Sequence, residues 1–234
     1  MTQIDIDAGP VPAAPETLDL YREVHKGIRR ALFGLCEAAG TLDASDPEAR
    51  AAFIARFAAL DQMLTLHHDH EDGAPLGSLI AAVAPQFVAE LDAGHRRAVD
   101  GLALLREGVI GLSDGGDTDA LYDRVAAFVV EYLAHMTVEE HQVMPVLAAR
   151  STFDELLAVQ IAIRTGMPPT DMVLFMRSML PAMNPDERTA MLGGMRAGAP
   201  PEIFAVFWAT AVDVLTADEL AFVSRRLDVT AVAS

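Results

Sequence analysis

Four stretches of this chain carry apolar residues at steps of three and four, the spacing that places side chains on one face of an α-helix. The four stripes lie within residues 18–35, 53–71, 88–105 and 121–139. Short connections between long helices favour antiparallel neighbours. We therefore predict an all-α fold in which residues 17–150 form an up-down-up-down four-helix bundle.

Local signals predict where these helices begin and end. Thr17 is an expected N-cap for the first helix, and Gly40 is its expected end. Asp46-Pro47 combines a cap with a first-turn proline and predicts the start of the second helix. The Gly73-Ala74-Pro75 segment should end or bend that helix, and the third helix should begin after Pro85. The fourth stripe fades near residue 150.

The chain ends differ from this central part. Residues 1–16 contain three prolines and little periodicity, which predicts a flexible N-terminal arm. Residues 151–234 form a C-terminal helical region in which a proline pair, a phenylalanine and a capping box recur after 32 positions. The pairs are Pro168-Pro169 with Pro200-Pro201, Phe175 with Phe207, and residues 184–187 with 216–219. This repeat predicts two short helical hairpins as an extension of the bundle.

Composition excludes several classes of partner and site. The chain has 17 Lys and Arg against 34 Asp and Glu, a formal charge of −17, so it should bind neither nucleic acid nor an anionic membrane surface. The single cysteine, Cys36, excludes an intramolecular disulfide and cysteine-based metal clusters. Neither a basic-then-apolar leader nor an apolar run of ~18 residues is seen. We expect a soluble, cytoplasmic protein.

Six ionisable residues occupy the apolar stripes, where burial without a partner is costly. One buried histidine is commonly a hydrogen-bonded core residue, and a metal-free polar core is the alternative for the whole set. A pair of metal ions would satisfy all six side chains, with two histidines on each metal and both glutamates shared. The residues are His25, His67, Glu71, His95, His135 and Glu139.

These residues resemble the motifs of the hemerythrin-like, or HHE cation-binding, domain family over about residues 17–150. The resemblance rests on His25, His95, the His67-x-x-x-Glu71-Asp72 motif and the His135-x-x-x-Glu139-Glu140 motif, which Met144-Pro145-Val146-Leu147 follows. It implies a non-haem di-iron site with the six residues as ligands. Two irons per chain, with Mn or Zn as substitutes, and O2, peroxide or NO as small ligands are the corresponding expectations.

Two departures separate the chain from the oxygen-carrying hemerythrins. Those proteins have a second histidine one turn after the third-helix histidine, where Val99 stands here, and their last spacing would select Glu140 over Glu139. The chain is more similar to bacterial hemerythrin-like proteins and to the iron-sensing F-box hemerythrin domain. Simple oxygen storage is therefore not the expected role. His68, His70 and Glu140 stay open as additional or alternative ligands.

Two tyrosines lie on the same stripes, one turn before a histidine. Tyr21 precedes His25, and Tyr132 precedes His135. Each is expected either to pack in the core with its hydroxyl satisfied or to lie beside the metals, where it would hydrogen-bond bound oxygen or ligate iron.

Three functions follow for such a protein. It could bind or sense a diatomic gas or peroxide, with the C-terminal helices reporting the event or forming a homodimer. It could be a di-iron oxidase, oxygenase or peroxide-decomposing enzyme, with those helices closing a pocket over the bundle. It could also sense or store iron, in which case removing iron should loosen the bundle.

Overall fold

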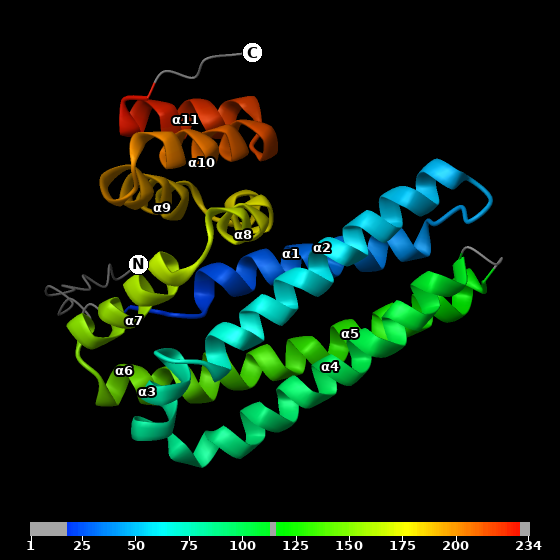
Figure 1. The fold of residues 1–234 in the computed structure, drawn as a ribbon, viewed down its shortest axis with the longest axis horizontal. Coiled ribbons are helices and arrows are strands. Elements are labelled where there is room, and N and C mark those ends of the chain that lie inside the picture. The colour runs from blue at the N-terminus through cyan, green and yellow to red at the C-terminus, as the bar shows by residue number, and fades with distance from the viewer. Residues whose placement is uncertain (1–17, 113–115, 230–234) are drawn as a thin grey trace, which may run out of the picture.

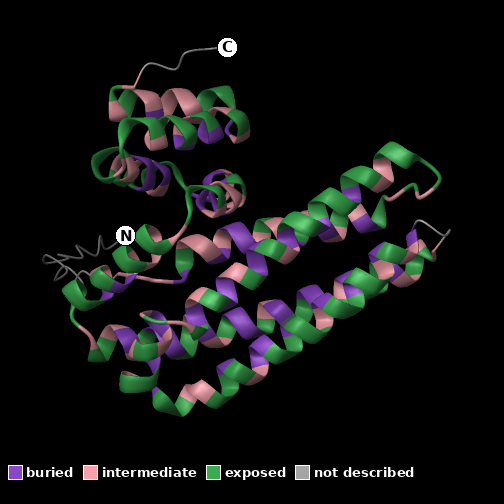
Figure 2. Ribbon diagram, in the orientation of Figure 1, coloured by how far each residue is buried: buried purple, intermediate pink, exposed green. Residues whose placement is uncertain are grey.

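Residues 18–112 and 116–229 are described in the computed structural model, and every regular element in them is a helix, which confirms the all-α prediction. The predicted N-terminal arm lies outside these residues. Four long helices pack around one interior: α1 (Arg22–Gly40), α2 (Pro47–Asp72), α4 (Val88–Gly111) and α5 (Thr118–Val138). Helix α1 contacts α2 and α5, and α4 contacts the same two helices (Figure 1). Their buried residues face inward (Figure 2), an arrangement compatible with the predicted four-helix bundle.

Helix α1 begins later than predicted. The expected cap, Thr17, lies outside the described residues, and the helix starts at Arg22. The carboxylate of Asp19 accepts hydrogen bonds from the backbone N–H groups of Tyr21 and Arg22, at 3.0 and 2.9 Å. It thus satisfies N–H groups that have no partner within the helix. Tyr21, although it precedes the helix, is still buried.

Helix α2 begins and ends as predicted. The carboxylate of Asp46 accepts from the backbone N–H of Glu48, and the helix ends before Gly73. Two elements that the periodicity missed then follow, the helix α3 (Leu76–Val83) and the short 3-10 helix η1 (Pro85–Phe87). Helix α3 is too short for a stripe to be recognised. Its Leu76 and Ile80 are buried in a second, smaller apolar cluster.

The fourth long helix contains a wide turn. After α5 the chain continues through the π-helix η3 (Glu139–Val143) into α6 (Met144–Arg150). Pro145 explains the change, because proline has no N–H to donate to the carbonyl of His141 and its ring crowds that carbonyl. The π turn begins at Glu139, so it reshapes the backbone that carries this predicted ligand.

The C-terminal region contains one helix more than the two predicted hairpins. Its helices are α7 (Phe153–Gly166), α8 (Pro169–Ala182), α9 (Pro185–Gly198), α10 (Pro201–Val214) and α11 (Ala217–Leu227). Helix α8 packs on α10 and α9 packs on α11, so helices 32 positions apart lie together (Figure 1). The predicted capping boxes are present at Asn184 and Thr216. A third box at Thr152 starts α7, again 32 positions earlier (184 − 152).

The C-terminal helices share the core of the long helices. Helix α8 packs closely along α1, where a Cβ added to Gly27 would lie 2.7 Å from Cγ of Met179. One apolar cluster runs from Ile28 and Leu32 on α1 to Met176 and Leu180 on α8. The division into a bundle and a separate C-terminal region therefore stays a prediction.

Among the described residues, no single helix has the length and apolar character needed to cross a membrane. The segments Leu76–Val83 and Pro85–Gly111 meet that test only when taken together, and they are bent by 106° at their junction. The cytoplasmic location stays a prediction.

Candidate metal centre

The six predicted residues come together inside the long helices. Helix α1 contributes His25, α2 contributes His67 and Glu71, α4 contributes His95, and α5 with η3 contributes His135 and Glu139; each is at most 6% exposed. Their ligand atoms form two groups of four that share both glutamates, and within each group all of these atoms lie within 4.8 Å of one another. The groups are His25, His67, Glu71, Glu139 and His95, His135, Glu71, Glu139.

Each oxygen of Glu71 faces a histidine of a different group. Its Oε1 lies 3.1 Å from Nε2 of His67, and its Oε2 lies 3.2 Å from Nε2 of His95. Burial and the nearby carboxylate of Glu139 raise the pKa of Glu71 well above its ordinary value. Without a metal, ionisation of this side chain is therefore disfavoured. With cations on both sides it could ionise and bridge them.

The carboxylate of Glu139 spans the two groups in the same way. Its Oε2 lies 3.4 Å from Nε2 of His25, and its Oε1 lies 3.1 Å from Nε2 of His135. Burial would raise the pKa of Glu139, but the adjacent imidazoles of His135, His95 and His25 outweigh it and lower the pKa well below the ordinary value. Burial would lower the pKa of His95, but the surrounding carboxylates outweigh burial and raise this pKa to about 10. In the metal-free chain His95 is therefore a cation beside Glu139.

Hydrogen bonding tests whether this cluster fits a pair of metals. Eight buried atoms, the Nε2 atoms of the four histidines and the four oxygens of Glu71 and Glu139, have no hydrogen-bond partner among the described residues. A polar core that served only for stability would pair most of these atoms, because an unpaired buried polar group costs ~1–3 kcal/mol. Imidazole nitrogens and carboxylate oxygens are suitable donors for iron and manganese. The residues therefore fit a two-metal site better than a metal-free polar core.

Carboxylates on the outer side orient two of the histidines. Nδ1–H of His25 donates to Oε1 of Glu140 at 2.8 Å, and Nδ1–H of His95 donates to Oδ1 of Asp72 at 2.7 Å. Glu140 also accepts two hydrogen bonds from Arg29, at 2.6 and 2.9 Å. Burial would raise the pKa of Glu140, but the hydrogen bonds from His25 and Arg29 outweigh burial and lower this pKa to about 2. Such contacts fix the imidazole so that Nε2 faces the donor group.

His68 and His70 lie in different surroundings. His68 is buried and stacks on His95 with ring centroids 4.5 Å apart, and its Nε2 shares a hydrogen bond of 2.9 Å with the hydroxyl of Tyr132. Burial lowers the pKa of His68 to about 3, so the ring is neutral. His68, His95 and His135 also form a third group of candidate metal-binding atoms. The ring of His70 instead faces Phe175 of α8.

The two tyrosines differ in how their hydroxyls are satisfied. Both side chains are buried, and burial together with the charges of Glu71 and Glu139 raises the pKa of each well above its ordinary value. Tyr132 bonds to His68, whereas the hydroxyl of Tyr21 has no partner among the described residues. Tyr21 therefore offers a free donor beside the cluster.

Sequence reasoning missed the glycine that makes room for His135. A Cβ added to Gly94 on α4 would collide with Nδ1 of the His135 ring. The available signal was a glycine in a helix interior, immediately before His95. Sequence reasoning also missed the roles of Asp72 and Glu140 in orienting histidines, although both stand in the motifs.

Comparison with known families matches residues 86–167 to the hemerythrin HHE cation binding domain. The matched segment contains His95, His135 and Glu139, while the elements that carry His25, His67 and Glu71 precede it. Searches of curated proteins and of solved structures gave no match. The family match confirms the resemblance that the motifs predicted. Over residues 86–167, the chain is therefore similar to the hemerythrin HHE cation binding domain.

Proposed function

We propose that this chain is a hemerythrin-like non-haem di-iron protein that binds or reacts with O2, peroxide or NO inside a four-helix bundle. The observation that supports it best is the pair of donor groups that share Glu71 and Glu139, whose eight donor atoms have no hydrogen-bond partner among the described residues. Each iron would receive two histidines and two carboxylate oxygens, about four of a usual six positions. When bound, the iron pair supplies electrons and open coordination positions for a small ligand.

The surrounding residues have separable tasks in this proposal. Glu71 and Glu139 would hold both irons, and Asp72 and Glu140 keep the Nε2 atoms of His95 and His25 directed at the donor groups. The unpaired hydroxyl of Tyr21 is the donor placed to hydrogen-bond a small ligand at the centre.

Metal stoichiometry tests the proposal first. Elemental mass spectrometry of the purified full chain, normalised to chain concentration, should give about two irons per chain, with manganese or zinc able to replace iron. Anaerobic ferrous loading should restore that value after chelation. A chain that holds no metal after such loading would show that the six residues form a polar core, and the proposal would fail.

Mixing the ferrous protein with O2 separates binding from catalysis. A spectral change that persists and reverses on degassing supports the binder, whereas rapid irreversible oxidation or repeated peroxide consumption supports an oxidase, an oxygenase or a peroxide-decomposing enzyme. The enzyme is favoured by a cavity at His67 and Glu71 that α7 and α8 help to close. Iron sensing or storage predicts instead that chelation loosens the helices, which far-UV circular dichroism would detect.

A further inference from the structure

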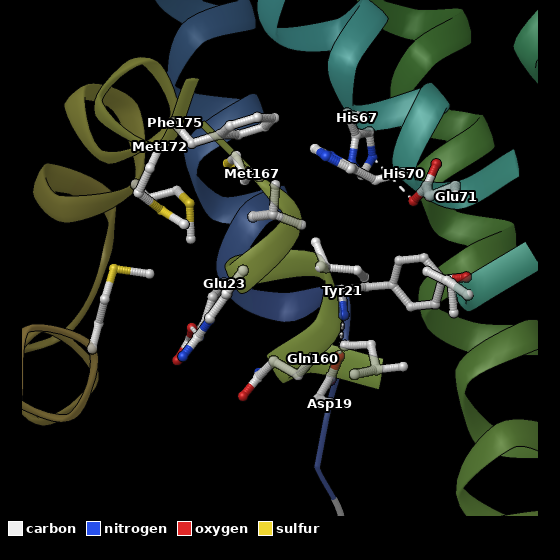
Figure 3. A pocket seen from close by; sticks show the side chains of 17 residues that line it. Asp19, Tyr21, Glu23, His67, His70, Glu71, Gln160, Met167, Met172 and Phe175 are labelled. Atoms are coloured by element: carbon white, nitrogen blue, oxygen red, sulfur yellow. Dashed lines mark hydrogen bonds and ion pairs between the residues drawn. The ribbon is translucent and has the colours of Figure 1, made fainter. Parts of the chain in front are cut away.

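A cavity of about 100 Å³ lies between the long helices and the C-terminal helices. Figure 3 shows Met172 and Phe175 on one side of this space and His67 and Glu71 on the other, with Tyr21 beside them. The metal centre and the C-terminal helices therefore line the same chamber, here called the methionine cavity.

The C-terminal side of the methionine cavity is apolar and deformable. Four methionines line it, from the end of α7 to α9, together with Phe175. Unbranched thioether side chains fill irregular spaces and adapt to different ligands. They are Met167, Met172, Met179 and Met191. A ligand in this cavity would lie against thioethers at one end and against the side chains of the metal centre at the other.

Charges around the methionine cavity disfavour an anion. Asp19, Glu23 and Glu71 line it. Among the described residues that line the cavity, one is a Lys or Arg, namely Arg164. Its guanidinium forms an ion pair with Glu23 at 3.1 Å. His70 also lines it, with its ring facing Phe175 of α8. The chain as a whole carries a formal charge of −17. At the end of the chamber away from the donor groups, a neutral molecule therefore suits it better than a carboxylate or a phosphate.

The cavity volume limits the size of the ligand. An apolar protein cavity of about 150 Å³ accommodates benzene. By proportion, the methionine cavity would take a molecule of about four non-hydrogen atoms, or one or two more where the thioether side chains move aside. This is larger than a diatomic gas and smaller than most cofactors.

The donor group that contains His95 and His135 has different surroundings. A separate cavity of about 260 Å³ lies against His95, Glu71 and Glu139, and Asp72 and Asp92 line it as well. Neither a methionine nor a residue of the C-terminal helices is among its described lining residues. The two donor groups therefore face chambers of different character, and the methionine cavity is the one that reaches His67.

We propose that the methionine cavity binds a small uncharged organic molecule with a largely apolar body, beside the donor group that contains His25 and His67. The inference rests on the proposed di-iron function and extends it, because it names the chemical class of the co-substrate. It also gives α7, α8 and α9 a role in completing the site.

The test uses the full chain labelled with ¹³C at the methionine methyl groups, loaded with zinc so that the signals stay sharp, and 1-butanol as the probe. The signals of the four cavity methionines should shift on titration, while those of Met63 and Met136, buried elsewhere in the core, should not. Butyrate should bind at least tenfold more weakly than 1-butanol.

Matched variants locate the effect. Val24→Phe fills the methionine cavity and should weaken 1-butanol binding at least tenfold, whereas Val88→Phe, the same change in the second cavity, should leave it unaltered. Ile163→Phe on α7 is a second filling variant should Val24→Phe fail to fold. Equal binding by a folded filling variant and the unsubstituted chain would overturn the inference.

Two further arms separate the alternatives. Tighter binding of butyrate than of 1-butanol would mean that Arg164 or the zinc ions recognise an anion. Shifts with xenon but not with 1-butanol would mean that only gases enter. Either result overturns the inference. Failure of the di-iron function would appear separately, as an absence of iron in elemental analysis, because the probe titration requires no iron chemistry and can be repeated on the metal-free chain.

Discussion

Nδ1–H of His25 donates to Oε1 of Glu140 at 2.8 Å, and this bond directs the opposite nitrogen of the ring into the interior. The two residues are 115 positions apart in the chain. The motif spacing of the oxygen-carrying hemerythrins would select Glu140 as a ligand. Among the described residues, however, Glu140 is absent from the candidate metal-binding groups. It positions His25, while its neighbour Glu139 belongs to both donor groups.

Replacing Glu140 should weaken metal binding without removing a donor. Glu140→Gln and Asp72→Asn each weaken the hydrogen bond that orients a histidine, so we expect metal affinity to fall about 10- to 100-fold in each variant. Competition with a metal chelator measures this change. Glu131→Gln, an exposed change on α5, is the control and should retain the original affinity. Unchanged affinity in both test variants would contradict the orienting role.

Loss of Glu71 should have opposite effects in the two metal states. Burial raises the pKa of this carboxyl, so its ionisation is unfavourable in the metal-free chain. Glu71→Gln should leave the metal-free chain equally stable or more stable in urea unfolding, and should reduce the bound metal from about two ions to one or none. Marked destabilisation of the metal-free variant would argue against a metal role for this carboxylate.

The two buried tyrosines should respond differently to loss of their hydroxyls. Tyr132→Phe removes the partner of Nε2 of His68 and should cost ~1–3 kcal/mol of unfolding free energy. Tyr21→Phe removes a hydroxyl that has no partner among the described residues, so its cost should be close to zero. Urea unfolding of both variants, without metal, makes the comparison. Equal losses would show that Tyr21 has a structural partner.

Space at Gly94 should be essential to the metal centre. The methyl group of Gly94→Ala collides with the His135 ring, so we expect at least a tenfold loss of metal affinity. Gly108→Ala on the same helix is the control, because its added Cβ first meets Cδ1 at the end of the Leu121 side chain, at 2.9 Å. Elemental analysis after limited metal loading compares them. Full metal retention by Gly94→Ala would contradict the packing described here.

Acid should weaken the C-terminal helices through their capping boxes. The backbone N–H of Thr216 is the main cause that lowers the pKa of Glu219, and Arg188 contributes at 2.7 Å. Because the folded pKa lies below the unfolded one, the stabilisation is complete above about pH 4.5 and is lost as pH falls through the folded pKa.

Glu219→Gln should therefore flatten the fall in stability between about pH 5 and pH 3, measured as the urea midpoint at each pH. Glu202→Gln on the exposed surface of α10 is the control and should keep the slope of the unsubstituted chain. An unchanged slope in Glu219→Gln would refute the assignment of this acid sensitivity to the capping box.

Local patterns determined the long helices and the composition of the candidate site. Apolar steps of three and four predicted α1, α2, α4 and α5, because helical periodicity depends only on near neighbours. The same periodicity placed His67 with Glu71 and His135 with Glu139, each pair one turn apart. Capping boxes at Asn184 and Thr216 were likewise visible, since their hydrogen bonds span three residues.

Contacts between distant helices decided the rest. The chain order gives no sign that each oxygen of Glu71 faces a different donor group, that Gly94 leaves room for His135, or that α8 lies against α1 and encloses a cavity beside His67. Side-chain packing sets these relations through the depth and angle at which helices meet, which periodicity within one helix does not encode. The sequence by itself thus determined which donors enter the interior, and the tertiary structure decided how they are shared, oriented and reached.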